Sequence, residues 1–84
     1  MTPSYDCKYV VTGKSTNKGA FREEGVASTL RRDDDRRTMA ELRIKFERDA
    51  IAAFNEVTQW KGNPKYLGVT DLKVELGEIE VVGD

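Results

Sequence analysis

Residues 38–61, TMAELRIKFERDAIAAFNEVTQWK, are the stretch that decides the fold of this 84-residue chain. Their apolar side chains recur at the three- and four-residue spacing of an amphipathic helix. At about 100° per residue, seven of them lie within roughly 60° of Met39, namely Leu42, Phe46, Ala50, Ala53, Phe54, Val57 and Trp60. This stripe predicts one long helix, about 38–61, whose apolar side covers a small sheet.

Local signals mark both ends of the predicted helix. Thr38 is expected to cap its N-terminus, and Glu41 three residues later completes a capping box. An alternative start lies at residues 33–35, whose carboxylates would favour the helix dipole. We prefer Thr38, because the apolar stripe does not extend back into the arginines. Gly62, with a proline two residues later, predicts the stop.

Two strand patterns precede the helix. The alternation from Tyr5 to Val11 predicts a strand with one buried face, with Cys7 as a small buried side chain. Residues 13–19 are polar and bracketed by glycines, which indicates a hairpin loop. Residues 20–30 predict a weaker, antiparallel strand, and the spacing of its apolar residues predicts a bulge at Gly25.

The last third of the chain predicts a third strand over residues 69–82. Its apolar residues change phase at Gly77, which we interpret as a bulge in one strand rather than a turn between two. The predicted fold is therefore α+β with the order ββαβ. A three-stranded, mainly antiparallel sheet packs on one helix, and residues 1–84 form a single compact domain. A helix of about 36 Å would overhang strands of about 20–27 Å.

Charge is unevenly distributed along the chain, although the net charge is only −1. Residues 1–32 carry six basic and three acidic groups, a net charge of +3. Residues 62–84 carry two basic and five acidic groups, a net charge of −3. Either the two ends pair as neighbouring strands and neutralise each other, or they form a dipolar surface that steers a charged partner.

The composition argues against several classes of protein. Cys7 is the only cysteine, so an internal disulfide is excluded and a reducing cytoplasm is expected. The N-terminal segment lacks the features of a signal peptide, and no apolar run is long enough to span a membrane. Histidine, the commonest general base and metal ligand, is absent.

Two motif fragments carry little weight. Residues 13–16, GKST, resemble the end of a phosphate-binding P-loop, but the earlier glycine and the following helix are missing. Residues 33–35 are three aspartates without the spaced ligands of a calcium loop, and arginines flank them. We therefore expect no enzyme, no cofactor and no bound metal.

Two sets of residues are candidate partner contacts. The basic set lies in and around the hairpin and comprises Lys14, Lys18, Arg22, Arg31, Arg32, Arg36 and Arg37. The apolar set is Ile44 and Ile51, which lie at roughly 140° and 120°, on a common side outside the main stripe. Either the sheet or a loop covers these isoleucines, or they form a second strip for a protein partner or a homodimer.

These features predict a protein-binding module. Small phage or mobile-element proteins that inhibit a host defence complex by surface occlusion (anti-CRISPR-like) have comparable size and composition. The alternative is a small RNA- or DNA-binding protein. It would use the basic hairpin 13–22 for phosphates and Tyr5, Tyr9 and Phe21 for base stacking. The isoelectric point of about 5.5 argues against that alternative.

Overall fold

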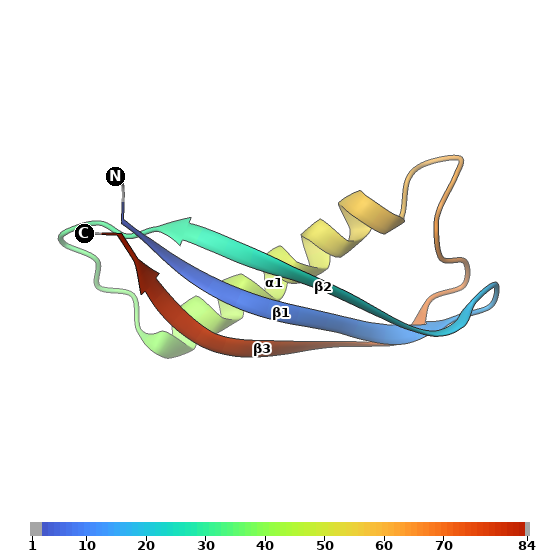
Figure 1. Cartoon of the computed structure of the whole chain (residues 1–84), viewed down its shortest axis with the longest axis horizontal. Helices are drawn as coiled ribbons and strands as arrows, with labels where there is room; N and C mark the ends of the chain where they lie inside the picture. The colour runs from blue at the N-terminus through green and yellow to red at the C-terminus, as the bar shows by residue number, and fades with distance from the viewer. Residues whose placement is uncertain (1–2, 84) are drawn as a thin grey trace.

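The computed structural model describes residues 3–83, so residues 1–2 and 84 of the predicted domain lie outside the described part. The elements are β1 (Ser4–Ser15), β2 (Gly19–Leu30), α1 (Met39–Thr58) and β3 (Thr70–Val82). β1 is the central strand of an antiparallel sheet with the order β2-β1-β3, and α1 crosses one face obliquely (Figure 1). The predicted α+β fold and the order ββαβ are confirmed.

The core lies between α1 and the sheet and consists of two clusters joined by Tyr9. One cluster contains Val11, Phe21, Ala50, Phe54 and Tyr66, and the other contains Cys7, Ala27, Leu42 and Phe46. The strand residues among them are spaced by two or by multiples of two, because alternate side chains of a strand point to the same face. The predicted burial of Cys7 is confirmed.

The buried stripe of α1 differs from the predicted one at its ends. Its buried residues are spaced by four and comprise Leu42, Phe46, Ala50, Phe54 and Thr58. Such a row drifts about 40° around the helix at each step, so α1 has to cross the sheet at an angle. Met39, Val57 and Trp60 are consequently 56%, 69% and 66% exposed, and their assignment to the core was wrong.

The ends of α1 are partly as predicted. The Oγ1 atom of Thr38 accepts a hydrogen bond of 3.1 Å from the N–H of Glu41, which confirms the cap. The helix ends at Thr58, three residues before the predicted end. The carbonyl of Thr58 there accepts a 2.6 Å hydrogen bond from the N–H of Lys65, which turns the chain back. Gly62, with a φ of 85°, lies in the turn beyond the helix.

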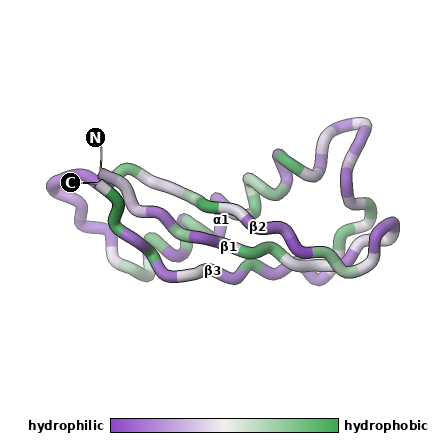
Figure 2. The backbone as a smooth tube through the Cα atoms, viewed as in Figure 1, coloured by the Kyte–Doolittle hydropathy of each residue, from purple (hydrophilic) through white to green (hydrophobic). Residues whose placement is uncertain are grey.

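The strands are longer than the expected length of about 20–27 Å, although β2 and β3 nearly coincide with the predicted ranges 20–30 and 69–82. They contain 12, 12 and 13 residues, which corresponds to about 40 Å. The 20 residues of α1 span about 30 Å, so the expectation that the helix is too long for its sheet was wrong. The Cα atoms extend over 46 × 22 × 15 Å, with the hydrophilic hairpin tip and the connector 31–37 at opposite ends (Figure 2).

The two glycines predicted as bulges behave differently. The β1–β3 register shifts opposite Gly77, which confirms that bulge. The β1–β2 register is uninterrupted, so the bulge predicted at Gly25 is absent. A Cβ on Gly25 would lie 2.5 Å from Cζ of Tyr9, so this glycine makes room for the ring. Because β2 keeps its phase, Val26 and Leu30 are exposed on the face away from the helix.

A second irregularity of β3 had no signal in the sequence. The register with β1 shifts again between Thr12 and Lys14. Asp71, on the shifted part of β3, has a φ of 55°, in the left-handed region. That conformation costs a residue other than glycine about 1–2 kcal/mol. β3 is therefore irregular at two places, whereas β2 is regular throughout.

Replacing Gly25 with alanine is expected to lower the free energy of unfolding by about 1–3 kcal/mol, because the ring of Tyr9 must leave its place between the clusters. Gly77→Ala is the matched control, since the nearest atom to its added Cβ is the Lys8 carbonyl oxygen at 3.4 Å. That variant should change stability by less than about 0.5 kcal/mol. Urea denaturation measures both, and equal losses would contradict the role assigned to Gly25.

Candidate functional site

The sheet face opposite α1 is uncovered, since no other element of residues 3–83 packs on it (Figure 1). We call it the open face. Its side chains are those of Asp6, Lys8, Val10, Thr12 and Lys14 from β1, Arg22, Glu24, Val26, Ser28 and Leu30 from β2, and Lys73, Glu75, Glu80 and Val82 from β3. Most of them are charged or polar, and the aliphatic ones are few and at least partly exposed.

Cations from three strands meet at one end of the open face. Arg22 and Lys73 flank Thr12, their common register partner on β1. Lys14 lies two residues further along β1, on the same face. Lys18 belongs to the hairpin tip and lies close enough to Glu23, on the helix side of the sheet, to help lower the pKa of that carboxyl. We call Lys14, Arg22 and Lys73 the basic end. Two of them, Lys14 and Arg22, belong to the predicted basic set.

Neighbouring carboxylates offset the basic end only weakly. Arg22 forms an ion pair of 2.7 Å with Glu24, and Lys14 lies 3.9 Å from Asp71. These four side chains are 61–69% exposed, and such pairs contribute at most about 1 kcal/mol. Lys73 forms no ion pair among residues 3–83. A shallow hollow of about 440 Å³ lies between Lys14 and Lys73.

The other half of the open face is acidic. Glu24 and Glu75 flank the same residue of β1 from either side, and Glu80 is the register partner of Asp6 nearer the chain termini. We call these four carboxylates the acidic end. Lys8 is the one cation on this half of the face, within the described residues. The sign of the charge therefore changes along the length of the strands.

The remaining arginines of the predicted basic set lie elsewhere. Arg31, Arg32, Arg36 and Arg37 belong to the connector that follows β2. Since the strands of the hairpin are about 40 Å long, the connector lies at the far end of the sheet from the hairpin tip (Figure 1). The structure thus divides the predicted basic set into two separate groups.

Arg37 is engaged within the chain. Its guanidinium donates to both carboxylate oxygens of Asp35, at 2.6 and 3.0 Å, and to the carbonyl of Leu30 at 2.7 Å. The hydrogen bonds from Arg37 hold the pKa of the Asp35 carboxyl well below its ordinary value. This arginine fastens the connector to the end of β2, whereas Arg32 and Arg36 are exposed.

The aromatic residues considered for base stacking face the helix. Phe21 is buried and stacks on Tyr66 with the ring centroids 4.1 Å apart. Tyr5 and Tyr9 pack against the core clusters. The basic end points to the opposite face of the sheet. The structure therefore does not bring these rings and the cations together.

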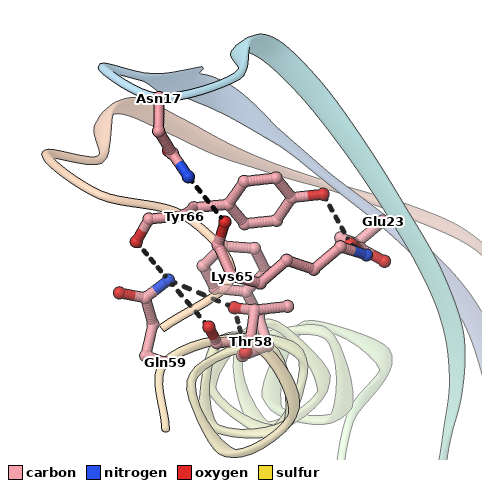
Figure 3. A network of polar contacts seen from close by, with 7 residues as sticks. Asn17, Glu23, Thr58, Gln59, Lys65 and Tyr66 are labelled. Atoms are coloured by element: carbon pink, nitrogen blue, oxygen red, sulfur yellow. Dashed lines mark hydrogen bonds and ion pairs between the residues drawn. The ribbon is translucent and has the colours of Figure 1, made fainter. Parts of the chain in front are cut away.

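Polar contacts hold the hairpin tip against the loop that precedes β3 (Figure 3). The Asn17 amide donates to the carbonyl of Lys65 at 2.9 Å and accepts from the N–H of Leu67 at 2.8 Å. Gln59, at the end of α1, donates to the carbonyl of Tyr66 at 3.1 Å. The hairpin tip next to the basic end is therefore held in place by the loop and does not project freely.

Glu23 adds a charged contact to this junction. Its Oε1 atom accepts hydrogen bonds from Nζ of Lys65 and from Oη of Tyr66, both 2.6 Å long. The bond from Lys65, followed by that from Tyr66, lowers the pKa of Glu23 below its ordinary 4.5. Burial and the bond to Glu23 raise the pKa of Tyr66. Glu23 and Glu24 lie on opposite faces of the sheet.

The Glu23→Gln variant is expected to lose about 1 kcal/mol of stability at pH 7, because it replaces a charge-assisted bond. A carboxyl with a lowered folded-state pKa stabilises above its unfolded-state pKa, and this contribution disappears as the pH falls through the folded-state value. The difference from the unsubstituted chain should therefore shrink below pH 4.5. Urea titrations at pH 7 and in acid measure it, with Glu24→Gln as control. A difference that persists undiminished in acid would contradict this assignment.

Ile44 and Ile51 are 53% and 38% exposed on the outer side of α1. Neither the sheet nor a loop of the described chain closes over them, so the reading in which they are covered does not hold. They lie on the opposite side of the molecule from the open face. The two predicted contact sets are therefore on different surfaces.

Lys73 is the member of the basic end that the sequence did not suggest. Its position depends on the β1–β3 register, which the bulge at Asp71 helps to set. Residues 62–84 have a net charge of −3, so Lys73 was not grouped with the cations of the hairpin. Asn17 was missed for a similar reason, because its partners lie 48 and 50 residues away.

Residues 3–83 contain no group of three histidine, cysteine, aspartate or glutamate side chains placed to hold a metal ion. In the same range, no helix combines the length and apolar character needed to cross a membrane. Burial raises the pKa of the Cys7 thiol. Comparisons with protein families, curated proteins and solved structures found no match. The surfaces of the chain are therefore the basis for a functional proposal.

Proposed function

We propose that the chain is a non-enzymatic protein-binding module whose basic end contacts an acidic protein surface. The observation that carries the proposal is the convergence of Lys14, Arg22 and Lys73 from three strands on an uncovered face. Cations held by a sheet are already positioned, so they steer and orient an acidic partner at little entropic cost.

Surface occlusion is the mode of action that suits such a module. An open face about 40 Å long is large enough to cover a binding site on another protein. By analogy of size and composition, we propose an inhibitor of the phage or mobile-element kind, directed at a host defence complex. Its compartment would be the cytoplasm, where a single cysteine stays reduced. A partner could instead bind the acidic end in a basic groove of its own. We rank this contact below that of the basic end, because a mimic of an acidic ligand would carry far more negative charge than the net −1 of this chain.

Binding of RNA or DNA by hairpin 13–22 is the second candidate, because the same cations would contact phosphates. With Tyr5, Tyr9 and Phe21 facing the helix, binding would depend on charge and should weaken steeply with salt. A gel shift with single-stranded RNA and DNA at two salt concentrations tests this. Absence of binding at low salt would remove the candidate.

The triple variant Lys14→Glu, Arg22→Glu, Lys73→Glu is expected to weaken partner binding about tenfold or more, because three attractive contacts become repulsive. Arg32→Glu, Arg36→Glu is the matched control at the far end of the sheet, and its affinity should stay within about twofold. Affinity capture from the native host supplies the partner, and calorimetry with the purified pair measures binding. Unchanged affinity in the triple variant would sink this proposal.

Ile44 and Ile51 are proposed as a second, apolar contact for a protein partner. Ile51→Ser should weaken binding while lowering stability by less than about 1 kcal/mol, because its side chain is partly exposed. Leu42→Ser is the comparison, since Leu42 is buried and its loss should unfold much of the population. The melting temperature and the affinity for the partner are measured for both variants. A large loss of melting temperature with binding intact would assign Ile51 to the core alone.

A further inference from the structure

The open face is complementary to itself. Its basic end and acidic end occupy opposite halves of one surface, and both consist of side chains on the same three strands, all of them exposed except the half-buried Asp6. Consider a two-fold axis that lies in the plane of this face and runs across the strands. Rotation about it places the basic end of each copy on the acidic end of the other. A stacking that superimposes like ends would bring like charges together.

We infer that the open face joins two copies of the chain, packed sheet to sheet with their strands antiparallel. This inference rests on the proposed function, since a second copy supplies an acidic surface for the basic end, and the second copy and the host protein then compete for the same face. With the axis between Lys8 and Val10, each strand lies over its own counterpart. The row of Arg22 and Lys73 in one copy then faces the row of Asp6 and Glu80 in the other.

The same arrangement gives Lys8 a site in the other copy. A shallow hollow of about 580 Å³ lies over Val10, and Glu24 and Glu75 stand on either side of it. Gly77 contributes no side chain and so leaves the hollow open. With the axis between Lys8 and Val10, Lys8 of each copy enters the hollow of the other and meets both carboxylates. Lys8, the one cation in the acidic half of the open face, thus gains two carboxylates of the other copy as counter-charges.

The dimensions fit a weak dimer. Three strands of about 40 Å, spaced about 4.8 Å apart, offer about 570 Å² per copy. The pair would bury about 1,100 Å², slightly more than the roughly 1,000 Å² that a specific interface needs. Val10, Val26, Leu30 and Val82 supply limited apolar area, so a dissociation constant in roughly the micromolar range and a strong salt dependence are expected. Each helix would then face outward.

Sedimentation from about 10 µM to 1 mM is the first test. The unsubstituted chain is expected to dimerise at low salt and to dissociate about tenfold more readily at high salt. A monomer throughout this range would overturn the inference. A Lys8→Glu variant should also dissociate more readily, and dimerisation that is unaffected by this substitution would overturn the proposed geometry.

Two charge-reversed variants provide the sharper test. The acidic variant carries Lys14→Glu, Arg22→Glu and Lys73→Glu, and the basic variant carries Glu24→Lys, Glu75→Lys and Glu80→Lys. Each alone should be monomeric, because like charges meet at both ends. An equimolar mixture should form a heterodimer, because opposite charges meet again. A mixture of two folded variants, verified by circular dichroism, that does not associate would refute the antiparallel pairing.

The proposed dimer and the proposed protein-binding function can be refuted independently of each other. A monomeric chain whose affinity for a captured host protein still depends on the basic end would overturn the dimer and leave the proposed function. A charge-swapped heterodimer, combined with host-protein binding that ignores the basic end, would support the dimer and overturn the contact proposed with the host protein.

Discussion

One helix with a single buried row can seal only one face of a three-stranded sheet, and the rest of the molecule follows from that constraint. The row of α1 is spaced by four, so the helix crosses the strands obliquely and its contact with them is narrow. Aromatic rings fill the space between the helix and the sheet at positions where a strand has a glycine. Gly25 accommodates the ring of Tyr9, and a Cβ on Gly13 would lie 2.7 Å from Cζ of Phe21. Charged residues that the helix does not cover gather on the other face.

The segment between α1 and β3 depends on a second set of contacts. The Tyr66 ring stacks on Phe21, and the neighbouring Phe54 ring of α1 is nearly parallel to both. Backbone bonds to Asn17 hold the same segment against the hairpin tip. A loop without regular structure is thereby fixed at both its helix side and its sheet side. The backbone that carries the cations at that end of the sheet is therefore held in place, although their side chains are exposed.

The features that were predicted correctly have local causes. The cap at Thr38, the bulge at Gly77 and the burial of Cys7 each depend on a few neighbouring residues, as does the order ββαβ. The wrong predictions concern relations between distant segments. Burial of Val57 and Trp60 depends on the crossing angle of α1, which no local periodicity defines. The predicted basic set falls into two groups because the hairpin is long and separates its tip from the connector. Lys73 lies beside Lys14 and Arg22 because of the β1–β3 register, which the sequence does not encode locally.

The irregular backbone of β3 has a consequence for solubility. β2 and β3 are the outer strands, and each presents N–H and C=O groups that have no strand partner on that side. A long, straight edge of this kind is a template on which further chains add, which is a route to aggregation. The shifts at Gly77 and Asp71 break the even spacing of these groups in β3, and three glutamates along it repel an identical strand. The same distortions that bend β3 therefore keep the sheet from growing at that edge.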